Sequence, residues 1–234
     1  HGKIMGMRLE HGGHLTHGHR VSATGALWNQ VAYGVERDTE VLDYKKLEEI
    51  AKKEKPDIVV AGFTAYSRIV DFKKMKNVAR AAGTILMVDA SHFAGLIAGG
   101  VYPSPFPCAD IVTMTTHKTL RGPRGAIIFI RKSKDTNFEE KIDKAVFPGL
   151  QGGPHMNAIA AIAVALKEAA TPAFRAYAKR VVKNAQTLAG ELQKHGWRVI
   201  SGGTDSHLFL LDTAGRGVPG KVAQERLERA GIVV

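Results

Sequence analysis

A lysine inside the segment THKTLRGPRG, residues 116–125, is the first candidate for chemistry in this sequence. Lys118 follows the apolar segment DIVTMT at 110–115, which has the composition of a buried strand. An α/β fold places its ligands at the carboxyl ends of such strands, where an amine can act as a nucleophile or form a Schiff base. The same spacing also fits an ordinary surface lysine, and only a second site can separate the two interpretations.

The second candidate site lies in VDASHFAG, residues 88–95, where another apolar segment ends. It contributes Asp89 and His92, and a carboxylate at this position can hold the protonated ring nitrogen of a heteroaromatic cofactor. A lysine Schiff base combined with an aspartate on the ring nitrogen is typical of pyridoxal phosphate chemistry. Asp89 alone could equally cap the following helix, so the cofactor hypothesis depends on its combination with Lys118.

The segment HGGHLTHGH, residues 11–19, contains four histidines: His11, His14, His17 and His19. They lack the HExxH spacing and the cysteines that would indicate zinc, so we expect no metal site. A histidine ring can also stack on a planar cofactor, and the neighbouring glycine pair would allow close approach. An ordinary loop is the remaining alternative.

A glycine-rich turn, FPGLQGGP at 147–154, precedes a predicted helix that begins near Asn157. Backbone N–H groups at such a turn can bind a phosphate, although Gly and Pro form loops for many other reasons. The sequence contains neither GxxxxGK[ST] nor a GxGxxG at a strand-helix turn. Nucleotide binding is therefore not predicted.

These candidates require a scaffold whose strands end at one edge, and the hydrophobic pattern predicts one. Apolar segments rich in Ile, Val and Leu alternate with helical stretches at 44–55 and 72–83, which is typical of a mostly parallel sheet flanked by helices. The predicted strands are KIMGM (3–7), IVVAGF (58–63), ILMVDA (85–90), DIVTMT (110–115) and AIIFI (126–130). The predicted fold class is α/β.

The pattern changes after residue 131, where a polar segment and the glycine-rich turn lead into two helices, 157–170 and Pro172 to about His195. Two segments that look like paired strands and a last helix follow: WRVIS (197–201), HLFLLD (207–212) and Gly220 to about Ala230. We therefore predict a domain over 1–175 and the beginning of a smaller α+β domain over 176–234.

Composition indicates a globular chain: 44% of the 234 residues are hydrophobic, enough to bury a sizeable core. The formal net charge is +11, which could serve nucleic acid, but the lysines lie largely on polar helix faces and we do not expect nucleic acid binding. With the single cysteine Cys108 and no segment resembling a membrane span or signal peptide, we expect a cytoplasmic protein without membrane association. The chain begins with His1 rather than Met, and we expect both ends to be cuts through a longer protein.

Six motifs together resemble the serine hydroxymethyltransferase family, pyridoxal phosphate enzymes with the aspartate aminotransferase fold. They occur in the family's order over essentially the whole chain: GGHLTHG, AGFTAYS, VDASHFAG, TTHKTLRGPRG, VFPGLQGGP and SGGTDSHLFL. The resemblance implies the large domain of a fold type I pyridoxal-phosphate-dependent transferase, lacking its N-terminal part, and the start of the small domain. Its implied activity is the reversible transfer of the hydroxymethyl group of serine to tetrahydrofolate, yielding glycine and 5,10-methylenetetrahydrofolate.

The resemblance also implies roles for individual residues. Lys118 would bind the cofactor covalently, Asp89 would pair with its pyridine nitrogen and His14 would stack on its ring. His92 and Thr64 would contact the oxygen side of that ring, and His117 would help to set reaction specificity. We group Lys118, His117, Asp89 and Thr115 as catalytic candidates.

The resemblance further implies a homodimer with shared sites, because Gly152 and Gly153 would reach the cofactor phosphate of the neighbouring subunit. The folate would lie against Leu9, Gly13, His14 and Leu15. Ala90 and Ser91 depart from the family's pattern without altering the named roles.

Two parts of the family pattern have no counterpart here: the N-terminal catalytic glutamate and the C-terminal arginine that binds the substrate carboxylate. We therefore expect the 234-residue chain alone to be inactive. The alternative is another pyridoxal phosphate enzyme of the same fold, such as a threonine aldolase, which would keep Asp89 and Lys118 but would not need folate.

Overall fold

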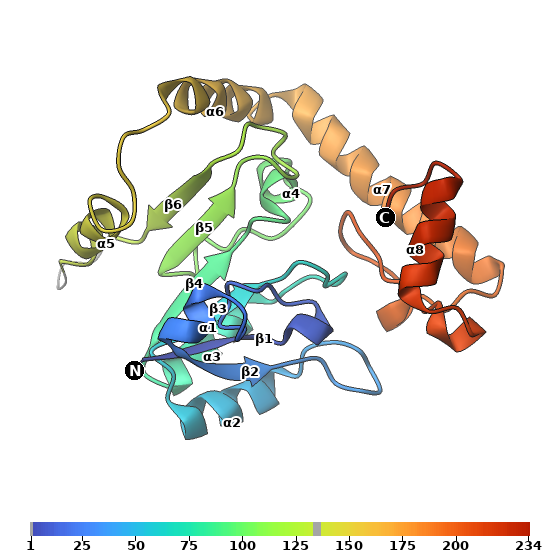
Figure 1. The fold of residues 1–234 in the computed structure, drawn as a ribbon, viewed down its shortest axis with the longest axis horizontal. Helices are drawn as coiled ribbons and strands as arrows, with labels where there is room; N and C mark the ends of the chain where they lie inside the picture. The colour runs from blue at the N-terminus through green and yellow to red at the C-terminus, as the bar shows by residue number, and fades with distance from the viewer. Residues whose placement is uncertain (1, 133–136) are drawn as a thin grey trace.

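The computed structural model describes residues 2–132 and 137–234, and a six-stranded sheet lies at its centre (Figure 1). The strand order is β2-β1-β3-β4-β5-β6, with β1 to β5 parallel and β6 antiparallel to β5. The strands are β1 (Lys3–Met7), β2 (Asn29–Tyr33), β3 (Ile58–Gly62), β4 (Ile85–Asp89), β5 (Ile111–Thr115) and β6 (Ala126–Ile130). The predicted α/β class and mostly parallel sheet are confirmed.

The sequence pattern missed β2. The strand NQVAY begins with two polar residues, Asn29 and Gln30. Its apolar run, VAY, is shorter than the apolar runs that indicate the other strands. β2 forms one edge of the sheet and pairs with β1 alone, so its first residues can face solvent. An edge position is therefore compatible with the polar residues at the start of this strand.

Helices connect and cover the strands. They are α1 (Ala23–Leu27), α2 (Tyr44–Glu54), α3 (Phe72–Ala81), α4 (Ala94–Ala98), α5 (Phe138–Val146), α6 (Met156–Ala169), α7 (Pro172–Lys194) and α8 (Gly220–Arg229). α2 and α3 begin at Asp43 and Asp71, whose carboxylates accept backbone N–H groups of the first turn. The pattern predicted α2, α3, α6, α7 and α8 and missed the short α1, α4 and α5.

The core lies where α2 and α3 pack on the sheet. Their apolar faces meet the central strands and bury a continuous cluster that includes Met5, Val59, Leu86, Leu47, Met75 and Val78. Phe174 of α7 joins the same cluster, which attaches the beginning of that helix to the sheet domain. The apolar periodicity of α2 and α3 in the sequence therefore corresponds to a buried face of each helix.

The second part of the chain departs from the prediction in one respect. Segments 197–201 and 207–212 do not form paired strands; a single antiparallel bridge joins Val199 to Leu211. The backbone turns away immediately after Val199, because Ser201 and Gly202 both adopt left-handed conformations, with φ of 56° and 72°. The predicted domain boundary at 175/176 falls within the continuous α7, and the division into two domains stays a prediction.

Within the described residues, none of the helices combines the length and the apolar character needed to cross a membrane.

Candidate active site

The parallel strands bring the predicted site residues to one edge of the sheet. β1, β3, β4 and β5 are neighbours, and each carboxyl end continues into a segment that carries a candidate. His14 follows β1, Thr64 follows β3, Asp89 ends β4 and Lys118 follows β5. This edge is where an α/β sheet binds its ligands, so the sequence prediction of a shared site is supported by the topology.

Asp89 is the best-connected residue of this edge. Its Oδ2 lies 2.9 Å from Nε2 of His17, and its Oδ1 accepts hydrogen bonds from the Ser91 hydroxyl at 2.6 Å and the Ser91 backbone N–H at 3.1 Å. Burial by itself would raise the pKa of Asp89, but the hydrogen bonds from His17 and Ser91 lower the pKa to about 2. The carboxylate therefore stays ionised at neutral pH and presents a fixed negative charge.

His17 is a site residue whose role the sequence pattern did not reveal. Its side chain is almost fully buried, and two glycines make room for it. A Cβ on Gly62 would come within 2.6 Å of the Asp89 Cβ and 2.9 Å of the His17 ring, and a Cβ on Gly6 would lie 2.6 Å from the His17 carbonyl oxygen. The Gly62 position thus permits the close approach of His17 and Asp89. The only signal in the sequence was membership of the histidine-rich segment.

The segment that carries His14 is tied to the loop after β3. The carbonyl oxygen of Gly12 accepts hydrogen bonds from the backbone N–H groups of Thr64 and Ala65, at 2.8 and 3.1 Å. His14 Nδ1 lies 2.8 Å from the Thr16 hydroxyl, and its ring centroid is 5.6 Å from that of His17. Burial and the neighbouring His17 lower the pKa of His14, so its ring is neutral at neutral pH. His14 is thereby placed beside the Asp89–His17 pair.

His92 lies on the segment that follows β4, opposite the loop after β5. Thr119 joins the two loops, because its hydroxyl donates to the His92 carbonyl oxygen and accepts the Gly95 N–H, both at 3.0 Å. Burial, with a further contribution from the charge of Lys118, lowers the pKa of His92 to about 4. The Lys118 charge also lowers the pKa of His14, so the ammonium group is close enough to act on both rings.

The residue before the lysine, His117, is partly buried and lies near a second cation. Its Nε2 is 3.4 Å from Nη1 of Arg124. Burial lowers the pKa of His117, and the charges of Arg124 and Lys118 act in the same direction. His117 is therefore neutral at neutral pH and can accept or donate a proton.

Several buried polar atoms in this region have no hydrogen-bond partner. Among the described residues, these atoms are His17 Nδ1, Thr64 Oγ1, Thr115 Oγ1, His117 Nδ1 and His207 Nδ1. Buried polar groups are normally paired, and an orphaned group at a candidate site indicates an absent ligand or water. Donors and acceptors of this kind fit a polar heteroaromatic cofactor. In contrast, the described part of the chain has no group of three or more His, Cys, Asp or Glu side chains arranged for a metal ion.

Not every predicted residue joins this cluster. Gly152 and Gly153 lie on the exposed connection between α5 and α6, with open space where a Cβ would stand, and the structure does not bring them to Asp89 or Lys118. The predicted folate residues Leu9 and Leu15 are partly exposed on the segment after β1. Gly13 in that segment donates its N–H to the Arg8 carbonyl oxygen, and a Cβ there would collide with the Met7 carbonyl oxygen.

His207 reaches the cluster from the second part of the chain. Its ring is nearly parallel to that of His92, with 22° between the planes and 6.4 Å between the centroids. His207 lies in the motif SGGTDSHLFL, and nothing in the sequence pattern assigned it a role. Only the return of the chain to the sheet edge places it there.

A mostly parallel sheet with a lysine, an aspartate and histidines at its carboxyl edge defines a domain of the fold type I pyridoxal-phosphate class. Comparisons with known proteins specify the family. The family model described as serine hydroxymethyltransferase matches residues 1–234. The chain therefore belongs to the serine hydroxymethyltransferase family.

Individual relatives agree with the family match. The chain is 49% identical over 231 residues to the serine hydroxymethyltransferase of Nitrosococcus oceani and 52% identical over 231 residues to that of Alkalilimnicola ehrlichii. Each alignment covers 99% of this chain and 55% of the relative. The chain spans about half the length of the curated relatives it matches.

Proposed function

We propose that the complete protein carrying this chain is a serine hydroxymethyltransferase that uses pyridoxal 5'-phosphate and tetrahydrofolate to interconvert serine and glycine. The observation that carries the proposal is the combination, at one sheet edge, of an ionised Asp89 with the partly buried Lys118 and neutral His14 and His92. Family membership and the two named relatives support the same reaction.

The residues of the sheet edge fit pyridoxal phosphate. Lys118 would supply the amine that holds the cofactor, Asp89 would face its ring nitrogen and His14 would cover its ring, with the unpaired Thr64 hydroxyl and His92 available to ring oxygen. When bound, pyridoxal phosphate supplies an electron sink that stabilises a carbanion at the amino-acid α-carbon. The protein contributes position and charge to that chemistry.

The Asp89–His17 pair would keep the negative charge fixed in place. His17 and Ser91 hold both carboxylate oxygens, so the carboxylate cannot rotate freely or take up a proton at neutral pH. A preorganised charge of this kind stabilises a protonated ring nitrogen without further reorganisation. Neutral His117, beside Lys118, is suited to move a proton near the reacting amine.

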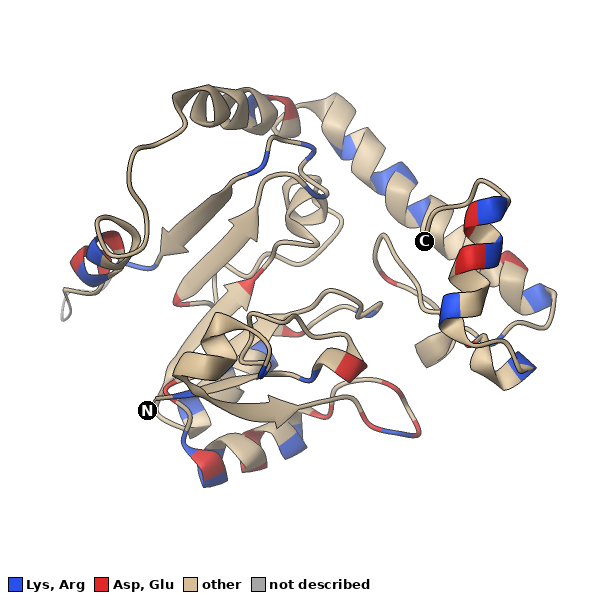
Figure 2. Ribbon diagram, in the orientation of Figure 1, with Lys and Arg blue, Asp and Glu red and all other residues tan. Residues whose placement is uncertain are grey.

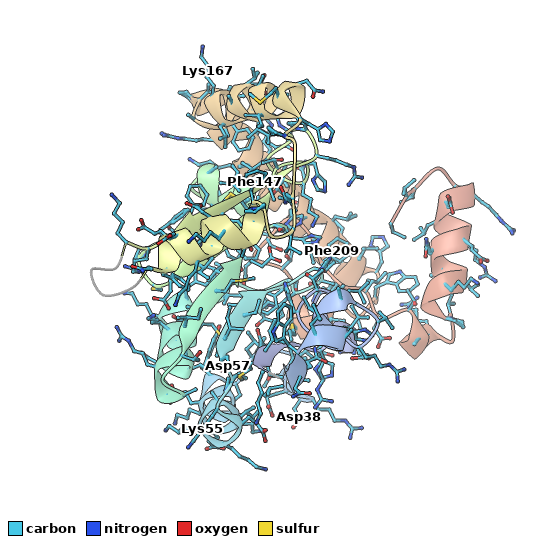
Figure 3. All side chains as sticks on the ribbon, turned by 60° about the vertical axis from the view of Figure 1, so that its left-hand side comes forward. Asp38, Lys55, Asp57, Phe147, Lys167 and Phe209 are labelled. Atoms are coloured by element: carbon cyan, nitrogen blue, oxygen red, sulfur yellow. The ribbon has the colours of Figure 1, made fainter. Side chains whose placement is uncertain are left out.

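A homodimer with shared sites is part of the proposal. α6 exposes several large apolar side chains, Met156, Ile159, Val164 and Leu166, and the connection before it exposes Leu150 and Phe147. Phe147 is labelled in Figure 3. An exposed apolar surface of this kind is typical of an interface. Gly152 and Gly153 lie within this surface, and we propose that their N–H groups bind the cofactor phosphate of the second subunit.

Charge gives no comparable support to a nucleic-acid function. Lys and Arg are distributed over several helices, and acidic residues are interspersed with them on α5 and α8 (Figure 2). Solvated helix faces account for this distribution. The single, unpaired cysteine, Cys108, supports our proposal of a cytoplasmic location.

The test of the cofactor site is chemical labelling of Lys118. Borohydride reduction of the complete protein with bound pyridoxal phosphate should fix the cofactor to the peptide that contains residues 116–125, because Lys118 follows β5 at the edge shared with Asp89. Peptide mapping by mass spectrometry identifies the labelled lysine. Label on any other lysine contradicts the assignment, and serine cleavage that does not depend on tetrahydrofolate contradicts the proposed reaction.

Subunit sharing is tested by complementation. A Gly153→Trp subunit has an intact Lys118 but a blocked phosphate loop, whereas a Lys118→Ala subunit has the reverse defect. If the loop serves the second subunit, a mixed dimer combines both defects in one site and leaves the other site intact. Mixed dimers can be isolated by placing a different affinity tag on each subunit. We expect such a dimer to have about half the activity of a wild-type dimer, because one of its two sites is intact. Mixed dimers no more active than the two parent variants would refute sharing.

A further inference from the structure

The contact between His92 and His207 joins residues that are 115 positions apart in sequence (207 minus 92). His92 follows β4 at the candidate active site, whereas His207 lies beyond α7. Nδ1 of His207 is buried without a hydrogen-bond partner among the described residues, and burial lowers the pKa of this ring. A partly buried ring with an unpaired, buried nitrogen beside another site histidine requires a physical explanation.

Specific polar contacts hold the segment before His207 against the loop after β3. Asp205 forms an ion pair with Arg68 at 3.1 Å, and its second carboxylate oxygen accepts the Ile69 N–H at 3.1 Å. The backbone N–H of Asp205 and the hydroxyl of Thr204 both donate to the Ser67 carbonyl oxygen, at 2.9 and 3.2 Å. These contacts hold the residue two positions before His207 in place.

A second set of contacts fixes the preceding turn. The Ser201 hydroxyl lies 3.0 Å from that of Ser67, and the Ser201 N–H donates to Glu40 at 2.6 Å. Arg198 also contacts Glu40, at 2.8 Å. The side chains of Thr204 and Ser206, on either side of Asp205, are buried. The segment 198–206 is therefore attached to the sheet domain along its length. These attachments restrict the position of His207, which follows the segment directly.

We infer that His207 is a positioning residue for His92: it covers the His92 ring and holds it in the orientation used at the active site. The inference rests on the proposed function for the role of His92 toward the cofactor, but the ring contact and the attachments of segment 198–206 are independent of it. His207 thereby couples the placement of the second part of the chain to the cofactor site.

The charged and titratable groups that act on His92 come from four segments: His14 after β1, Asp89 at the end of β4, Lys118 after β5 and His207. Asp89 raises the pKa of His92, and the other three lower it in addition to burial. Removal of His207 would open one side of the ring to water and remove one of these neighbours. Both changes favour protonation of His92.

The test uses the complete protein with 13C-labelled histidine, measured by NMR without cofactor, so that cofactor chemistry does not enter this measurement. His92 is assigned by the loss of its signal in His92→Gln. In His207→Ala, we expect the pKa of His92 to rise from about 4 toward its ordinary value by about one unit or more. In His207→Phe, the ring cover remains, and we expect a much smaller rise.

Asp205→Ala provides a second variant that leaves His207 itself unchanged. It releases the attachment to Arg68 and Ile69, and we expect it to raise the pKa of His92 in the same direction as His207→Ala. Glu191→Ala is the matched control, because it removes an exposed ion pair with Lys194 on α7. Affinity for pyridoxal phosphate should fall about tenfold in His207→Ala, as when a partner that orients a ligand-binding histidine is lost, and remain near wild type in the control.

The outcomes separate the two proposals. An unchanged His92 pKa in both His207→Ala and Asp205→Ala would overturn the positioning role. An equal rise in His207→Phe and His207→Ala would also overturn it, because ring cover would then not be the cause. A wild-type protein with the expected His92 titration but no pyridoxal phosphate binding would refute the proposed function and leave the His92–His207 contact intact.

Discussion

Replacing Lys118 by alanine is expected to reduce multiple-turnover serine cleavage at least about 10³-fold, because the amine that holds the cofactor covalently is lost. The same change should raise the pKa values of His14 and His92 in the cofactor-free protein, since the Lys118 charge lowers both. Steady-state kinetics of the complete protein and histidine NMR titration measure the two effects. The second effect distinguishes loss of a local charge from general misfolding.

Lys45→Ala is a suitable control for the lysine substitution, because Lys45 lies exposed on α2. We expect its activity and its histidine titrations to match those of the wild type. Turnover near the wild-type level in Lys118→Ala would show that another amine carries the chemistry. Unchanged pKa values of both histidines would show that the lysine does not lie at their edge of the sheet.

Asp89→Asn should lower turnover by about 10²- to 10³-fold, corresponding to the ~3–4 kcal/mol that one preorganised polar group typically contributes. The amide keeps the shape of the side chain but removes the negative charge that faces the ring nitrogen. Because the asparagine oxygen can still accept a hydrogen bond from Ser91, we expect the thermal unfolding midpoint to change little compared with turnover.

Asp110→Asn is the matched control for the aspartate substitution. Asp110 is also partly buried, precedes β5 and pairs with Lys76, so it lies at the opposite end of that strand from Thr115. We expect this control to lose stability without a comparable loss of turnover. If Asp89→Asn retains wild-type turnover, Asp89 serves only to fix His17 and the turn at Ser91.

Much of the fold follows from local patterns that the sequence contains. Continuous apolar segments predicted β1, β3, β4, β5 and β6. The central strands bury these runs between covered sheet faces, whereas the edge strand β6 leaves Ile128 and Phe129 exposed. The strand pair predicted after α7 does not form, and the sequence could not reveal this. Their apolar residues suggested a hairpin, whereas the left-handed backbone at Ser201 and Gly202 depends on the contacts of Ser201 with Ser67 and Glu40, far away in sequence.

The candidate site also contains some features that the sequence predicts and others that only the tertiary structure reveals. The sequence by itself determined that Asp89 ends a strand and that Lys118 follows one, and parallel strands end at a common edge, so the location of both residues at that edge was predictable. Only the tertiary structure decided that His17 rather than solvent supports Asp89 and that His207 returns from beyond α7 to cover His92. Both contacts depend on side chains from distant segments that meet in the folded chain, and no local periodicity or spacing encodes such a contact.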